Sequence, residues 1–273
     1  GDKIIAIVAP AYISQFGDDV TPGKFKTALQ VLGFSDVHEV AFGADVGAIS
    51  EAHHYAKEVA TGNLPFLLTS CCPSWSMMAK KFFPTMIDNI SQELTPMVAT
   101  ARKVKQDQPD AKVVFIGPCA SKKLEAMRRT VRSDVDFVLT FEELDAMFDA
   151  REIDPASFEE DGSLHDATAA GRGYAVAGGV AGAIEACLKE YYPDVPVHIE
   201  HAESLAECKK VLALAKAGKL NGCMIEGMAC PGGCMGGAGT NVPVAKSSKE
   251  LKKFLASCSK KLPPKGLVDI ELN

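Results

Sequence analysis

Three apolar segments of this chain each run directly into a loop that carries cysteine. They are PFLLTSCCPSW at 65–75, KVVFIGPCASKK at 112–123 and NGCMIEGMACPGGC at 221–234. Each apolar run has the length and composition of a buried β-strand, and a helix is predicted after each loop. Ligands of parallel α/β sheets collect beyond the carboxyl ends of the strands. We therefore expect the three cysteine loops to converge on one site.

Short apolar runs alternate with amphipathic segments, which is typical of α/β proteins with mainly parallel sheets. The strand-like runs lie at 3–9, 64–69, 111–117, 135–140, 196–200 and 221–226. The helix-like segments lie at 22–33, 45–61, 96–107, 141–150, 178–191, 202–217 and 247–257. Since neither an internal repeat nor an obvious linker divides the sequence, we expect residues 1–273 to form a single domain.

The charge and hydropathy of the chain argue against polyanionic and membrane partners. A formal net charge of -6 provides no basic field to attract nucleic acid or an anionic membrane surface. The longest apolar runs are far shorter than the ~20 residues that a membrane-spanning helix requires. The N-terminal sequence GDKIIAIVAP has neither the basic region nor the cleavage site of a secretion signal. These features predict a soluble, cytoplasmic protein.

The cysteine content indicates metal or redox chemistry. Nine cysteines are an odd number, which excludes a complete disulfide framework. Four thiolates suit an iron–sulfur cube, and the glycines between Cys230 and Cys234 let the backbone bend around a bulky inorganic core. A four-cysteine zinc site is the main alternative, although zinc usually uses two close cysteine pairs and this chain has one. The spacing favours iron–sulfur and leaves zinc open.

The cysteine motifs together resemble the signature segments of iron-iron hydrogenases, in the order in which that family has them. The segments are TSCCPSW at 69–75, PCASKKLE at 118–125 and EGMACPGGCMGGAG at 226–239, with looser matches in VAPAY at 8–12 and YAVAGGV at 174–180. The resemblance implies two α/β lobes of mainly parallel sheet flanked by helices, with an H-cluster in the cleft between them. This cofactor is a 4Fe-4S cluster joined through a cysteine sulfur to a two-iron subcluster with CO, CN and azadithiolate ligands.

The resemblance also implies a role for each motif cysteine. Cys72, Cys119, Cys230 and Cys234 would hold the 4Fe-4S cluster, and Cys234 would also bridge to the two-iron subcluster. Cys71 would be the free thiol that exchanges protons with the amine of the dithiolate, a role that suits a thiol of tuned pKa. The cysteines outside the motifs are expected to be structural; they are Cys187, Cys208, Cys223 and Cys258.

Further residues would complete the site. Lys122 would donate a hydrogen bond to one cyanide ligand, and the backbone around Pro10 and Ala11 would serve the other. Met228 would pack beside the two-iron subcluster, where a thioether adds bulk without a competing proton. Tyr174 is assigned to the same pocket from the looser segment match.

Beyond Cys71, Glu51 and Ser91 occupy the positions at which the family continues its proton relay. The outer relay departs from the family pattern, because this chain has His54 and Glu58 where a glutamate and an arginine are usual. A histidine conducts protons near neutral pH, so we expect an altered route.

The function implied by the resemblance is the reversible interconversion of H2 with two protons and two electrons. Ferredoxin or another electron carrier would be the redox partner, and maturation proteins would load the two-iron subcluster, which a heterologously made sample can lack.

Two alternative functions stay open. One is a hydrogen-sensing module of low turnover, which is favoured by the replacement of a family methionine by Gly117. The other is a non-catalytic 4Fe-4S protein of the iron–sulfur assembly branch. Ferredoxin-type cysteine clusters do not precede the motifs, which predicts a truncated or minimal form.

Overall fold

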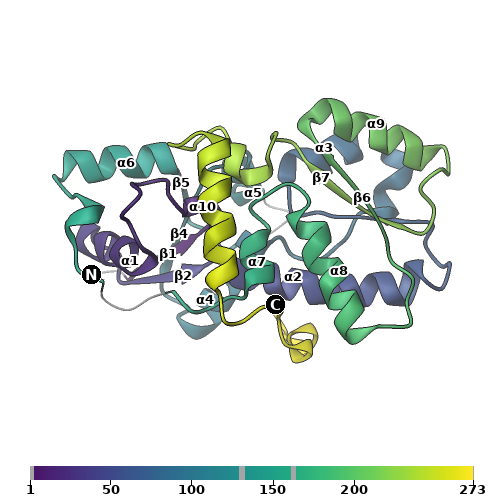
Figure 1. Ribbon diagram of the computed structural model, residues 1–273, viewed down its shortest axis with the longest axis horizontal. Coiled ribbons are helices and arrows are strands. Elements are labelled where there is room, and N and C mark those ends of the chain that lie inside the picture. The colour runs from purple at the N-terminus through teal and green to yellow at the C-terminus, as the bar shows by residue number, and fades with distance from the viewer. Residues whose placement is uncertain (1–2, 129–132, 161–163, 273) are drawn as a thin grey trace.

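Two parallel β-sheets, each flanked by helices, form the framework of the chain (Figure 1). The computed structural model describes residues 3–128, 133–160 and 164–272. The first sheet has the order β2-β1-β4-β5, with β1 (Ile4–Val8), β2 (Asp36–Glu39), β4 (Lys112–Gly117) and β5 (Phe137–Thr140). The second has the order β3-β7-β6, with β3 (Leu67–Leu68), β6 (His198–Glu203) and β7 (Cys223–Met228). The predicted fold class, two lobes of parallel sheet flanked by helices, is confirmed.

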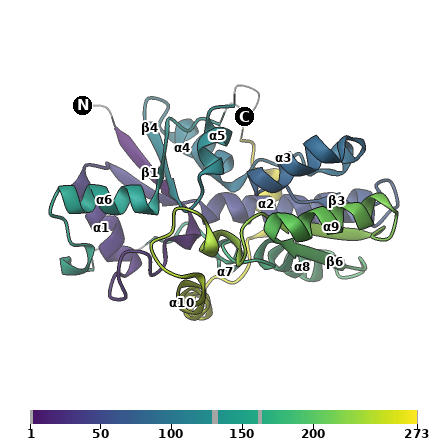
Figure 2. The ribbon, with the colours of Figure 1, turned by 90° about the horizontal axis from the view of Figure 1, so that it is seen from above.

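Helices pack on both faces of the second sheet, and one long helix joins the two lobes (Figure 2). The helices are α1 (Pro22–Leu32), α2 (Ala41–His54), α3 (Pro73–Phe82), α4 (Pro96–Asp107), α5 (Ser121–Ala126), α6 (Phe141–Ala150), α7 (Ala169–Gly173), α8 (Gly179–Tyr191), α9 (Ser204–Lys216) and α10 (Val244–Ser257). Helix α2 continues as a short π-helix, η2 (Tyr55–Val59), and contacts α4 in the first lobe and α8 in the second. Within the described residues, none of the helices combines the length and apolar character needed to cross a membrane.

Alternation of side chains along β7 explains why two helical layers enclose the second sheet. Met224 packs with Leu67 in a cluster that α2 and α8 cover. The next residue, Ile225, packs with Leu68 in a separate cluster that α3 and α9 cover. Since successive side chains of a strand point to opposite faces, both faces of this sheet are buried, as its continuous apolar sequence predicts.

Local sequence signals explain the helix boundaries that were predicted well. Helix α6 begins after Thr140, whose hydroxyl accepts the amide hydrogen of Glu143, while the Glu143 carboxylate accepts the Thr140 amide hydrogen. This reciprocal capping box ends the preceding strand and starts the helix. The predicted and observed bounds of this helix are therefore the same.

The observed elements differ from the sequence prediction in several places, among them an edge strand and the third cysteine loop. Strand β2 was missed because its sequence, DVHE, contains a single apolar residue and lies at the edge of the sheet. The helix predicted after the third cysteine loop is present as α10, but a 3-10 turn, Gly233–Gly236, comes before it. Gly232 and Gly233 both have positive φ angles, of 78° and 74°, a conformation that glycine adopts without steric cost and that does not continue a right-handed helix.

A buried ion pair joins α7 to the edge strand β2. The Arg172 guanidinium donates two hydrogen bonds to the Glu39 carboxylate, at 2.8 and 2.7 Å, and a third to the carbonyl oxygen of Leu164 at 3.1 Å. Arg172 is 7% exposed and Glu39 is 2% exposed. Burial opposes the charge of Arg172, but the hydrogen bonds and charge of Glu39 keep its pKa above the ordinary value. Each charge therefore depends on the other to remain buried.

Replacing Arg172 by Met should destabilise the chain by roughly 3–5 kcal/mol, because the Glu39 carboxylate would remain buried without its partner. Urea-induced unfolding measures this change. Lys246→Met is the matched control, since Lys246 pairs with Asp18 at the surface and exposed pairs contribute about 0–1 kcal/mol. Equal losses in the two variants would contradict the role assigned to the buried pair.

Candidate functional site

A cavity of about 100 Å³ lies at the carboxyl ends of strands from both sheets. Its wall is built from the segments that follow β1 and β4 in the first lobe and β3 and β7 in the second. All three cysteine loops contribute to this wall, and the motif cysteines that line it are Cys71, Cys72, Cys119, Cys230 and Cys234. The convergence of the loops that the sequence predicted is therefore present in the structure.

The thiols of this cavity share a poorly solvated environment. Burial raises the pKa of Cys234, and negative charge on Cys119 and Cys72 raises it further. The pKa of Cys230 is raised by burial and by the same two neighbours. Thiols whose ionised forms are destabilised in this way would be stabilised as thiolates by a positively charged centre between them. This donor set fits a cluster of iron ions.

The first turn of α3 favours the ionised form of Cys72. This cysteine directly precedes α3, so its sulfur lies at the positive end of the helix dipole. Burial is the largest influence and raises the Cys72 pKa, but the amide groups of Ala229 and Trp75 oppose this rise by donating hydrogen bonds. Trp75 is fixed in turn by a hydrogen bond of 2.9 Å from its indole nitrogen to the carbonyl oxygen of Thr69.

Lys122 brings a positive charge to the wall of the cavity. Its ammonium donates a hydrogen bond of 2.5 Å to the Glu125 carboxylate and one of 3.4 Å to the carbonyl oxygen of Cys71. Burial is the largest single influence and would lower the Lys122 pKa, but the charge and hydrogen bond of Glu125, together with the charges of Cys119 and Cys71, raise it above the ordinary value. Lys122 is therefore protonated although only 8% of it is exposed. Sequence reasoning missed Glu125, which the i,i+3 spacing from Lys122 could have revealed.

The remaining predicted cofactor contacts fall in two places. Pro10, Met228 and Tyr174 line the same cavity as the cysteines. Ala11 is fully buried in the hydrophobic core of the first lobe. Within the described part of the chain, the buried hydroxyl of Tyr174, which lies near Gly47 of α2, has no hydrogen-bond partner.

The predicted relay residues lie next to one another behind Cys71. Glu51 projects from α2, and its carboxyl group accepts hydrogen bonds from the Ser91 hydroxyl and the Ser70 amide. Burial raises the pKa of Glu51 to about 8, with a smaller contribution from the charge of Glu93. The charge of Glu51 in turn raises the pKa of Cys71, after the larger effect of burial. A carboxyl group with a pKa of about 8 can both accept and release a proton near neutral pH.

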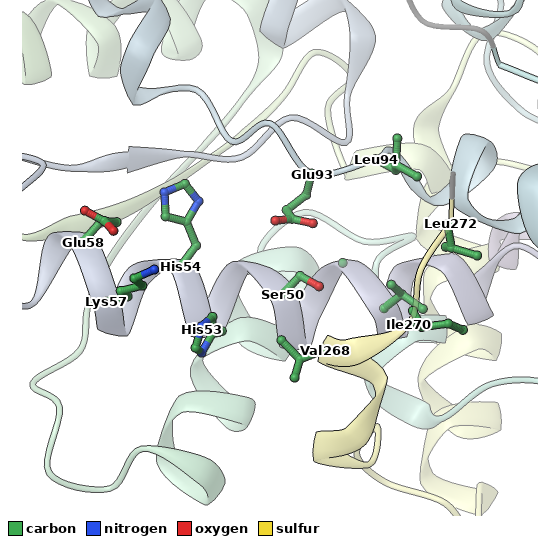
Figure 3. A pocket seen from close by; sticks show the side chains of 12 residues that line it. Ser50, His53, His54, Lys57, Glu58, Glu93, Leu94, Val268, Ile270 and Leu272 are labelled. Carbon is green, nitrogen blue, oxygen red and sulfur yellow. The ribbon is translucent and has the colours of Figure 1, made fainter.

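A second, larger cavity of about 430 Å³ lies between α2 and the loop that carries Glu93 (Figure 3). His54 and Glu58, the two positions that depart from the family pattern, both line it. Glu93 also lines it, and the sequence analysis missed this residue because no motif marks it.

Glu226 is a second buried carboxylate to which the sequence analysis gave no role. It is 1% exposed and accepts the amide hydrogens of Gly178 and Ala181, where α8 begins.

Comparison with known proteins matches these features to one family. A family model described as "Iron only hydrogenase large subunit, C-terminal domain" matches residues 2–238. Iron hydrogenase 1 of Clostridium pasteurianum is 31% identical over an alignment 279 residues long, which covers 87% of this chain and 48% of that protein. This chain therefore spans about half the length of that relative.

Two further comparisons concern the fold and one alternative function. An FeFe-hydrogenase structure from Chlamydomonas reinhardtii superposes with a TM-score of 0.77, covering 97% of this chain and 87% of the other at 23% identity. This likeness shows a shared fold. The cytosolic Fe-S cluster assembly factor NAR1 of Kluyveromyces lactis is 33% identical over 117 residues, which represent 43% of this chain and 25% of that protein.

Replacing Glu51 by Gln should reduce the pH dependence of stability. Burial raises the Glu51 pKa from 4.5 to about 8. At pH values between these two pKa values, the folded chain retains a proton that the unfolded chain releases. This carboxyl group therefore makes folding less favourable as the pH rises through that interval, by about 1.4 kcal/mol for each pH unit. In urea unfolding, the stability of Glu51→Gln relative to the parent should rise between pH 5 and pH 8. Glu142→Gln, at an exposed helix position, should show a constant difference, and a constant difference for Glu51→Gln would contradict the prediction.

Proposed function

This chain belongs to the family of the iron-only hydrogenase large subunit, and we propose that it interconverts H2 with two protons and two electrons at an H-cluster. One observation carries the proposal. Five cysteines, a charged lysine and a methionine from separate loops line a single cavity, and a buried carboxyl group stands directly behind the free thiol. Electrons would come from ferredoxin or another carrier, and maturation proteins would load the two-iron subcluster.

The residues of the cavity suit this cofactor better than a zinc ion. Cys72, Cys119, Cys230 and Cys234 would hold the 4Fe-4S cluster, and Cys234 would also bridge to the two-iron subcluster. When bound, the H-cluster supplies the redox chemistry and the iron position at which H2 is formed or split. A closed zinc site needs the four thiolates alone and gives no use to a fifth cysteine or to a buried, protonated lysine in the same wall.

Three side chains of the cavity have separate tasks in the proposed reaction. Cys71 holds a proton at Sγ and exchanges it with the carboxyl group of Glu51, which is hydrogen-bonded to Ser91. Lys122 stays protonated through Glu125 and so can donate a hydrogen bond to an anionic cyanide ligand. Met228 is 3% exposed and fills the wall without offering an exchangeable proton. The backbone at Pro10 and the hydroxyl of Tyr174 are proposed as further polar contacts.

A hydrogen sensor of low turnover is the second candidate, and the wall near Gly117 favours it. A Cβ atom at Gly117 would lie 2.6 Å from the ring of Phe115 and 2.9 Å from Cβ of Ala9. The aromatic ring therefore takes the space that a methionine at this position would need. The third candidate, a non-catalytic cluster protein similar to the assembly factor, has no need for Cys71 or Lys122.

Infrared spectroscopy after addition of a synthetic two-iron mimic tests the proposed function. We expect carbonyl and cyanide stretching bands together with H2 production from a reduced electron donor. Bands with very low turnover would favour the sensor. The absence of bands in a chain that holds its 4Fe-4S cluster would refute the hydrogenase proposal.

Replacing Cys71 by Ala should leave the infrared bands in place while H2 turnover falls by about a hundredfold or more, the usual scale for loss of a positioned acid–base group. Cys223→Ala is the matched control, because Cys223 lies outside the cavity at the start of β7. Turnover in Cys71→Ala equal to that of this control would refute the proton role of the thiol.

A further inference from the structure

Glu93 is anchored beside the buried end of the relay. Its amide group donates a hydrogen bond of 3.3 Å to the Ser91 hydroxyl oxygen, and its carbonyl oxygen accepts one of 3.3 Å from the Ser70 hydroxyl. Ser91 is also the residue whose hydroxyl donates to the Glu51 carboxyl group. The backbone of Glu93 is therefore held in place by the same groups that contact the innermost carboxyl group of the relay.

The side chain of Glu93, two residues after the buried Ser91, points into the cavity of about 430 Å³ (Figure 3). In Figure 3 it descends from the loop above α2, and the imidazole of His54 rises from α2 into the same space. The C-terminal segment closes another side of the cavity with apolar residues, namely Val268, Ile270 and Leu272. A cavity of this volume has room for several water molecules, and the exposed side chains of His53 and Lys57 border its opening.

Charge couples Glu93 to α2. Burial raises the pKa of Glu93, and positive charge on His54, followed by His53, opposes this rise. The other charged groups of the cavity, Lys57 and Glu58, belong to η2. Glu58 is engaged elsewhere, because its carboxylate accepts a hydrogen bond of 3.2 Å from the amide group of Asn63. Among these carboxylates, Glu93 is the one that is both anchored to Ser91 and coupled to His54.

We propose that Glu93 and His54 carry protons across this cavity between Ser91 and solvent. The proposal rests on the hydrogenase function proposed above. In the inward direction, His54 takes a proton from solvent and passes it to the Glu93 carboxylate, directly or through water. Glu93 passes a proton to the Ser91 oxygen while the Ser91 hydroxyl proton moves to Glu51. Each group returns to its starting state once a single proton has crossed.

The chemistry of the relay is thus preserved although its outer part is rearranged. The family positions on α2 that usually hold a glutamate and an arginine are His54 and Glu58 in this chain. A carboxylate is supplied instead from the opposite wall of the cavity, by Glu93, and the basic group is on the helix. A histidine paired with a carboxylate exchanges protons near neutral pH.

H2 turnover by the loaded holoenzyme gives the first test. Glu93→Gln should lower turnover at least about tenfold, with unchanged infrared bands and a larger solvent isotope effect, whereas Glu93→Asp should recover much of the rate. Glu142→Gln removes an equal charge at an exposed position of α6 outside this cavity and should keep turnover within about twofold of the parent. Turnover of Glu93→Gln equal to that of Glu142→Gln would overturn the proposal.

A carboxyl titration tests the proposal without H2 turnover. In the full chain, before the two-iron subcluster is supplied, NMR of 13C-labelled Glu side chains follows Glu93, whose signal is identified by its loss in Glu93→Gln. We expect a pKa above the ordinary glutamate value that rises further in His54→Gln, because the opposing positive charge is gone. An ordinary pKa that does not respond to His54→Gln would overturn the proposal whether or not the chain forms H2.

The two experiments separate this proposal from the proposed function. Failure of the hydrogenase proposal appears as a lack of carbonyl and cyanide bands in the parent and every variant. Failure of the relay proposal alone appears as bands and turnover in the parent that Glu93→Gln leaves unchanged.

Discussion

The burial of ionisable groups where the two sheets meet is the constraint on which the rest of this structure depends. Thiols, carboxyl groups and a lysine are removed from water at the carboxyl ends of four strands, and each such group is costly unless it gains a partner. Lys122 keeps its charge through Glu125. Glu226 is satisfied by amide groups at the start of α8. An iron–sulfur cluster would stabilise four of the thiols, those of Cys72, Cys119, Cys230 and Cys234.

Helix α2 connects the packing of the two lobes to the position of Glu51. Gly43 allows α2 to approach α4 so closely that an added Cβ atom would lie 2.2 Å from the carbonyl oxygen of Pro96. On the same helix, Asp45 accepts three hydrogen bonds from Thr168 and Gly171, while burial raises its pKa to about 6. Glu51 follows within the same rigid element. The contacts that hold the lobes together therefore also fix the position of Glu51 relative to Cys71.

The departures from the family pattern lie in the wall and in the outer relay, while the motif cysteines are retained. Phe115 fills the space beside Gly117, which changes the shape of the wall without opening a gap. In the proposed outer relay, the acidic group is Glu93 on the loop that faces α2, and His54 provides a basic group on the helix. A chain altered in these ways can keep the same cofactor chemistry while differing in the rate at which protons reach it. Turnover is therefore the property that separates an enzyme from a sensor.

The sequence by itself determined the local features: apolar runs that end in cysteine loops, the capping box at Thr140 and Glu143, and the cysteine motifs of one family. Each depends on residues close in sequence, so periodicity and spacing were sufficient. Strand β2 could not be predicted, because its pairing with β1, rather than its own side chains, makes it a strand. The turn at Gly233 likewise depends on the backbone of residues 175–177 packed against it. Tertiary structure alone brought Glu93 to His54, since the two belong to different elements and only folding places them in one cavity.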